Sequence, residues 1–82
     1  MKDIVFYTTQ HCGLCEAAMD ALLALPEAQG SRLRTIDVAL DDHLMAAYGT
    51  RIPVVAVGEA ELQAPFDQGT LQKWLQLSLI HI

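Results

Sequence analysis

Two cysteines three residues apart, Cys12 and Cys15, stand between a short apolar run and a longer helical pattern. The run, residues 4–8, is rich in aromatic and β-branched side chains, which is typical of a buried strand. Residues 13–25 are apolar almost all round, as in a helix with little exposed surface. Cysteines this close in sequence cannot staple distant parts of a fold together, so chemistry explains the pair better than a structural disulfide does.

The length of the chain limits it to one core. Of its 82 residues, 52% are hydrophobic and 18% are charged, which is typical of a globular domain and not of a disordered chain. A domain this short buries only about 60% of the surface that its unfolded chain exposes, which leaves no room for a second core. We therefore expect a single domain over residues 1–82.

Periodicity and turn residues predict the remaining elements. The first helix is expected to end between Pro26 and Gly30, because proline disfavours the helical conformation at the preceding residue and glycine accepts a left-handed turn. Asp41 is the predicted N-cap of a short second helix and Gly49 its C-terminal stop. The last helix is expected to start at Asp67. Further strands are predicted at residues 32–38, 52–57 and 61–64.

The resulting order is strand, helix, strand, helix, strand, strand, helix. A strand-helix-strand start implies a parallel pair with a right-handed crossover, and the closely spaced last two strands imply an antiparallel hairpin. The simplest packing is an α/β fold in which a four-stranded mixed sheet is flanked by three helices.

Charge and hydropathy exclude several kinds of partner. Five Lys and Arg against ten Asp and Glu give a net charge of -5, which repels phosphate backbones and anionic lipid. We expect neither nucleic acid nor a membrane as a partner. The apolar run after Met1 is too short for a signal peptide, and no stretch reaches the roughly 20 apolar residues of a membrane span. The prediction is a cytoplasmic protein that acts as a monomer.

The helical pattern assigns unequal roles to the two thiols. Cys12 shares the polar stripe of the predicted helix with Glu16 and Asp20, whereas Cys15 shares the buried stripe with Met19. Unpaired backbone N–H groups and the positive end of the helix dipole favour a thiolate at Cys12, and the thiolate is the species that attacks a disulfide. This arrangement predicts that Cys12 attacks a substrate disulfide and that Cys15 resolves the mixed disulfide.

Two neighbours of Cys12 are expected to tune its reactivity. Gly13 has no Cβ and leaves room for a partner to approach the sulfur. His11, when protonated, would stabilise the thiolate, whereas Glu16 would oppose it.

A metal site is the alternative explanation of the cysteine pair. Structural zinc normally takes four protein ligands, and this chain offers two cysteines with His11, His43 and His81 at no regular spacing. No metal ligand is therefore assigned. A two-cysteine copper site or a cluster shared across a dimer stays open, which would make the chain a non-catalytic module that carries a metal or cluster.

The motifs resemble those of the thioredoxin superfamily. The resemblance rests on the stretch from Tyr7 to Cys15 and on Ile52-Pro53-Val54-Val55 at the predicted third strand. Because the cysteine motif follows the first strand directly, the chain is most similar to small bacterial glutaredoxin-like proteins. The resemblance implies a Cys12 nucleophile, a resolving Cys15, a cis Ile52–Pro53 bond and an Ile52 backbone that pairs with a bound peptide. It also implies thiol-disulfide exchange on protein or small-molecule disulfides, with a reductase or glutathione as electron donor.

The chain departs from typical glutaredoxins where glutathione would bind. The lysine before the first cysteine is replaced by Thr8-Thr9-Gln10, and the threonine and valine before the proline are replaced by Arg51 and Ile52. Asp67 remains as an acidic residue for the glutathione ammonium, and Arg51 is the candidate cation for a substrate carboxylate. We expect no resident cofactor and only weak use of glutathione as a co-substrate.

Overall fold

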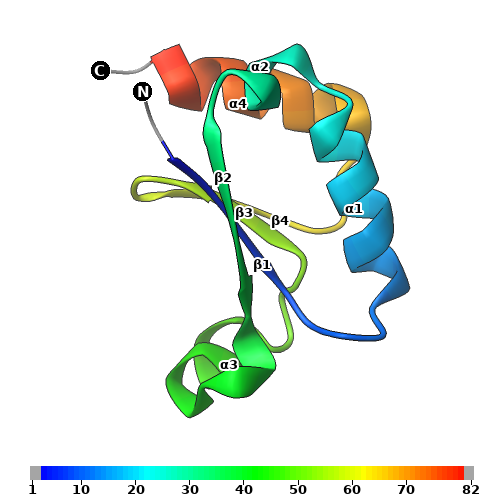
Figure 1. The fold of residues 1–82 in the computed structure, drawn as a ribbon, viewed down its shortest axis with the longest axis vertical. Coiled ribbons are helices and arrows are strands. Elements are labelled where there is room, and N and C mark those ends of the chain that lie inside the picture. The colour runs from blue at the N-terminus through cyan, green and yellow to red at the C-terminus, as the bar shows by residue number, and fades with distance from the viewer. Residues whose placement is uncertain (1–2, 81–82) are drawn as a thin grey trace.

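The computed structural model describes residues 3–80, which form a four-stranded mixed sheet with helices on one face and at one end (Figure 1). The elements in chain order are β1 (Asp3–Thr8), α1 (Gly13–Leu23), α2 (Pro26–Gln29), β2 (Arg32–Asp37), the 3-10 helix η1 (Val38–Leu40), α3 (Asp42–Tyr48), β3 (Val54–Val57), β4 (Ala60–Gln63) and α4 (Gln68–Ile80). The predicted α/β fold class is confirmed. No helix within residues 3–80 is long and apolar enough to cross a membrane.

The number of helices differs from the prediction because Pro26 starts a helix of its own. α1 ends at Leu23, and Pro26 is the first residue of the four-residue helix α2. Leu25 is extended, with φ -88° and ψ 132°, which is the conformation that a following proline favours. The fixed φ of proline suits the first turn of a new helix. Within residues 3–80 the sheet is therefore accompanied by four α-helices and not three.

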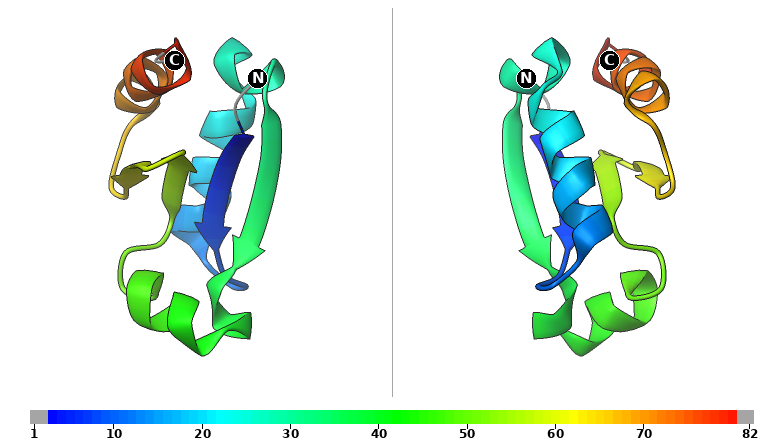
Figure 2. Two further views of the ribbon diagram at one scale, coloured as in Figure 1. Left: turned by 90° about the vertical axis from the view of Figure 1, so that its left-hand side faces the viewer. Right: turned by 90° about the vertical axis from the view of Figure 1, so that its right-hand side faces the viewer.

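The sheet has the strand order β2-β1-β3-β4. β1 runs parallel to β2 and antiparallel to β3, and β3 and β4 form the expected hairpin. The hairpin turns at Gly58, whose φ of 60° is favourable for glycine. Thr8 pairs with Asp37, so β1 and β2 end at the same edge of the sheet. Figure 2 shows α3 beyond this edge, where the chain also leaves β1 toward the cysteines.

The core lies between the sheet and the pair α1 and α4, which cover the same face (Figure 2). Alternate residues of β1, Ile4 and Phe6, point into it, because successive side chains of a strand lie on opposite faces. The inner face of α4 supplies Leu71 and Leu75, both fully buried, and Trp74 packs at the edge of the core. Burial of each such leucine stabilises the fold by about 1.5 to 3 kcal/mol. This packing fixes α1, and with it the cysteines, against the sheet.

Candidate active site

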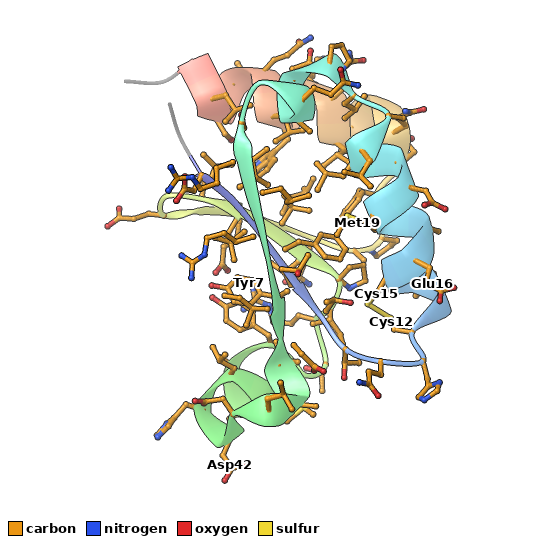
Figure 3. The ribbon with its side chains drawn as sticks, viewed as in Figure 1. Tyr7, Cys12, Cys15, Glu16, Met19 and Asp42 are labelled. Atoms are coloured by element: carbon orange, nitrogen blue, oxygen red, sulfur yellow. A yellow bond between two sulfur atoms is a disulfide. The ribbon has the colours of Figure 1, made fainter. Side chains whose placement is uncertain are left out.

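Cys12 is the N-cap of α1 and lies next to Cys15, to which it is joined by a disulfide (Figure 3). Its backbone is extended, with φ -112° and ψ 102°, and its Sγ accepts a hydrogen bond from the backbone N–H of Cys15 at 3.1 Å. Cys12 is half-buried, whereas Cys15 is 3% exposed. The two sulfurs therefore differ in access, and the outer one has an N–H donor aimed at it.

The residues between the cysteines leave the outer sulfur approachable. A Cβ placed on Gly13 would have no atom within 4 Å, so the space beside Cys12 is open. Leu14 is 68% exposed and offers an apolar contact directly beside the pair. A partner can approach Cys12 here without moving the backbone.

One hollow lies along α1 on the side of the β1–α1 segment. It measures about 460 Å³, and ten residues line it: Phe6, Thr8, Thr9, Gln10, His11, Cys12, Cys15, Glu16, Met19 and Asp20. Figure 3 shows Cys12, Cys15, Glu16 and Met19 following one another along α1. His11 lies in the turn before Cys12 with a φ of 59°, uncommon for a residue other than glycine, and its side chain is exposed. The hollow thus opens directly onto the cysteine pair.

A second, smaller hollow lies on the other side of α1 and contains Pro53. It measures about 130 Å³ and is lined mainly by apolar atoms, with Leu14 on α1 and Pro53 and Pro65 opposite. The Ile52–Pro53 and Ala64–Pro65 peptide bonds are both cis, and the N–H of Ala64 donates to the Pro53 carbonyl at 3.0 Å. The shared hollow places Pro53 opposite Leu14, on the helix that carries the cysteines.

The backbone of Ile52 is partly used within the protein. Its N–H donates to the Tyr48 carbonyl at 3.1 Å, and its side chain packs against the core. A peptide that paired with Ile52 in strand fashion would have to replace this hydrogen bond or use the carbonyl alone.

Arg51 lies on the opposite side of the sheet from the cysteines. Its guanidinium donates to Gln63 Oε1 at 2.9 Å, to Glu61 Oε1 at 2.7 Å and to the Ala47 carbonyl at 3.3 Å. Glu61 and Gln63 alternate with Leu62, which packs on the core, so they face away from α1. The structure does not bring Arg51 to the cysteine pair, and its hydrogen bonds leave it little freedom to bind a substrate carboxylate.

Arg51 belongs to a polar cluster with two tyrosines and Glu61. The Tyr48 ring stacks on Tyr7 with centroids 4.0 Å apart, and the Arg51 guanidinium lies 5.1 Å from the centre of the Tyr48 ring. The hydroxyl of Tyr48 donates to Glu61 at 2.6 Å. Hydrogen bonds from Tyr48 and then Arg51 hold the pKa of Glu61 below its usual value, and the bond to Glu61 raises the pKa of Tyr48.

Asp67 begins the last helix. Its Oδ1 accepts from the N–H of Thr70 at 2.7 Å, and its carbonyl accepts from the N–H of Leu71 at 3.0 Å, which makes it the N-cap of α4. The backbone N–H of Thr70 lowers the pKa of the Asp67 carboxyl. Asp67 directly follows Phe66, which lines the hollow of Pro53. Its carboxylate has a structural role that the sequence prediction did not include.

Metal ligands do not cluster in the described part of the chain. No group of three or more His, Cys, Asp or Glu residues that could hold a metal ion occurs there. His43 is exposed in the first turn of α3, where its N–H donates to Asp41, the predicted N-cap. His81 lies outside the described residues.

Sequence reasoning missed two features. The large hollow depends on how the segment after β1 packs beside α1, and no local pattern encodes that. Glu61 is also not singled out by the sequence pattern, although its position on β4 opposite Ala56 places it on a face shared with Tyr7. Tyr7 belongs to the stretch predicted as a buried strand, but it is half-buried on the face opposite the core.

The family comparison agrees with the fold. The sequence model of the glutaredoxin-like domain (DUF836) matches residues 3–76. The chain therefore belongs to the family of glutaredoxin-like domains. No curated protein matches its sequence.

Solved structures with the same fold include two of one bacterial protein. The X-ray structure of target protein XcR50 from X. campestris is 32% identical, with a TM-score of 0.77, and the match covers 90% of this chain and 96% of that chain. The solution structure of XcR50 is also 32% identical, with a TM-score of 0.76 and coverage of 94% and 95%. A mutant thioredoxin from Halobacterium salinarum NRC-1 is 20% identical, with a TM-score of 0.73 and coverage of 99% and 77%, and is similar in fold. The fold and the adjacent cysteines fit thiol-disulfide exchange.

Proposed function

We propose that the protein is a thiol-disulfide oxidoreductase that reduces or exchanges disulfides with Cys12 as the nucleophile and Cys15 as the resolving cysteine. One observation carries the proposal. Cys12 caps α1 at the rim of an open hollow and accepts the N–H of Cys15, while Cys15 is buried directly behind it. A donor aimed at Sγ and the positive end of the helix dipole both favour a thiolate, which is the attacking form of cysteine.

The reaction follows from this order of access. The Cys12 thiolate attacks one sulfur of the substrate disulfide, forms a mixed disulfide and releases the other sulfur as a thiolate. Cys15 loses its proton and attacks Cys12 Sγ, which forms the Cys12–Cys15 disulfide and releases the second substrate thiolate. Two electrons pass from the dithiol to the substrate, and both leaving sulfurs end as thiols. A dithiol or a reductase then returns two electrons to the protein.

Pro53 and Leu14 are the proposed apolar contacts of the substrate. They line the small hollow on one side of α1, within reach of a chain segment bound at Cys12. The Ile52 carbonyl is the proposed acceptor for a peptide N–H. Gly13 keeps the approach open, and His11 at the rim of the large hollow is the proposed tuning residue. We place this activity in the cytoplasm and assign it to a monomer.

The test is to trap the mixed disulfide. In Cys15→Ser the first attack proceeds but resolution fails, so a disulfide-bonded substrate should stay linked to Cys12. Mass spectrometry after reaction with a model disulfide should find one substrate thiol attached at Cys12. The matched variant Cys12→Ser, which keeps the buried thiol alone, should give no adduct. An adduct of equal yield on Cys15 would refute the assigned roles, and absence of any adduct would refute the activity.

A further inference from the structure

The large hollow beside the cysteines has two carboxylates in its wall. Glu16 and Asp20 follow Cys12 by four and eight residues on α1, and both line the hollow. An α-helix rises about 1.5 Å per residue, so the two residues lie about 6 and 12 Å from Cys12 along the helix axis. The reactive sulfur and two negative charges therefore face the same solvent-open space.

Neither carboxylate is neutralised within residues 3–80. No hydrogen bond or ion pair joins the side chain of Glu16 or Asp20 to another described residue. The arginines of that part of the chain lie elsewhere. Arg51 is paired with Glu61 on the opposite face of the sheet, and Arg32 approaches Asp3 at 3.9 Å. Apart from His11, no basic residue of the described part of the chain lines the hollow.

We propose that this hollow selects disulfides in peptide segments that carry basic side chains near the cysteine, with Glu16 and Asp20 as the specificity-determining residues. The inference rests on the thiol-disulfide exchange proposed above and defines its substrate class. A small disulfide with an amine close to each sulfur would reach only Glu16, the carboxylate nearer to Cys12. Because an extended chain advances about 3.3 Å per residue, Lys or Arg within four residues of the partner cysteine could approach both.

Glu16 and Asp20 affect how fast and how tightly a substrate binds, and they take no part in the electron transfer. Cys12 attacks the partner sulfur and Cys15 resolves the mixed disulfide as described, while Glu16 and Asp20 raise the local concentration of a cationic segment. The negative charge of Glu16 also opposes the Cys12 thiolate. A variant of Glu16 therefore changes the rate toward every disulfide, and only the ratio of rates between substrates reports on selectivity.

The experiment compares three capped peptides, each with one cysteine flanked by two Lys, two Gln or two Glu residues and each presented as its symmetric disulfide. Second-order rates of reduction by the dithiol protein are measured at pH 8, above the ordinary titration range of histidine. Reduction of the same peptides by dithiothreitol, a small dithiol that carries no charge until a thiol ionises, provides the reference rates. We expect the Lys-to-Gln rate ratio of the protein to be roughly five times that of dithiothreitol. The Glu peptide should react more slowly with the protein than the Gln peptide does. In 1 M salt the preference should fall below about twofold.

Variants separate the hollow from the net charge of the protein. Glu16→Gln with Asp20→Asn should reduce the Lys-to-Glu rate ratio to about the value for dithiothreitol. Asp20→Asn alone, which removes one charge from the hollow, should lower the ratio part of the way. Asp42→Asn removes one charge from α3, far from the cysteines (Figure 3), and should leave the ratio close to the wild-type value. The Gln peptide measures the exchange reaction itself in every variant.

The outcomes distinguish the two proposals. If the wild type reduces none of the three peptides, the proposed function fails. The selectivity proposal is wrong if the wild type reduces all three peptides with the same Lys-to-Glu rate ratio as dithiothreitol. It is also wrong if Asp42→Asn lowers this ratio as much as Asp20→Asn does. In both cases thiol-disulfide exchange itself still stands.

Discussion

Arg51 donates from Nη2 to Oε1 of Glu61 at 2.7 Å, on the sheet face opposite α1 and α4. Further donors of the same guanidinium contact Gln63 and the Ala47 carbonyl. Arg51 therefore connects the end of α3 and the segment before Pro53 to strand β4. Arg51, the basic residue nearest to Pro53 in sequence, therefore stabilises the fold on the sheet face away from the cysteines and is not part of the cysteine site.

Replacement of Arg51 should weaken the fold without removing exchange activity. We expect Arg51→Ala to lower the free energy of unfolding by about 1 kcal/mol at pH 7, because a partly exposed ion pair contributes at most about that much. Arg34→Ala, which removes an exposed arginine from β2, should change stability far less. Urea unfolding at pH 7 measures the free energy of unfolding of both variants. Equal losses in the two variants would argue against a stabilising role of the Arg51 contacts.

The same variant should show a defined pH dependence. Hydrogen bonds from Tyr48 and Arg51 lower the pKa of Glu61 in the folded state. A carboxyl whose pKa is lowered by folding stabilises the protein above its unfolded pKa of about 4.3, and loses that contribution as pH falls through the folded value. The difference in stability between wild type and Arg51→Ala should therefore be constant between pH 6 and 8 and shrink below pH 4. A difference that grows in acid would contradict this assignment.

Glutathione should bind weakly. Its two carboxylates require cations or helix N–H groups. Arg51 is occupied by Glu61, and residues 8–10 supply no lysine. Loss of one charge-assisted contact typically costs about 1.5 to 3 kcal/mol, or roughly tenfold to a hundredfold in affinity. We expect slow turnover in a glutathione-coupled assay and faster reduction of the oxidised protein by a dithiol. Rapid glutathione turnover that falls sharply in Arg51→Ala would overturn this.

Two substitutions of Asp67 can separate its role in the helix from a role in binding. Asparagine also caps helices well but carries no charge, whereas alanine removes the cap. Asp67→Asn should keep nearly the wild-type midpoint of thermal unfolding, and Asp67→Ala should lower it. If Asp67 holds the glutathione ammonium, turnover should fall equally in both variants. Turnover that falls only in Asp67→Ala would assign Asp67 to the cap alone.

The sequence predicted those features that depend on local chemistry. The N-cap at Asp41 is encoded by a carboxylate followed by free N–H groups, and the buried position of Cys15 follows from its helical spacing to Met19 and Leu22. Placement of Arg51 could not be obtained in the same way. Its partners, Glu61 and Gln63, lie ten and twelve residues further along, and their face of the sheet depends on the register of β4.

Metal content distinguishes the oxidoreductase from a carrier module. Cys12 and Cys15 are the thiols available, so a four-coordinate zinc site would need further ligands from a second chain or a small thiol, whereas a two-cysteine copper site would not. We expect protein purified under reducing conditions to contain far less than one metal ion per chain. Elemental analysis measures this directly. About one metal ion per chain, or one cluster per dimer, that is lost in Cys12→Ser would favour the carrier.

The two thiols should differ in their reaction with an alkylating agent. In the reduced protein at neutral pH, iodoacetamide should modify Cys12 first, because Cys12 lies at the rim of the hollow whereas Cys15 is 3% exposed. Peptide mapping after partial reaction assigns the site. In urea at a concentration that unfolds the protein fully, the preference should disappear, since both cysteines then have similar access and ordinary acidity. Faster modification of Cys15 in the folded protein would mean that the roles of the two thiols are reversed. A preference that persists after complete unfolding would mean that flanking sequence, and not the position of Cys12 at the start of α1, sets its reactivity.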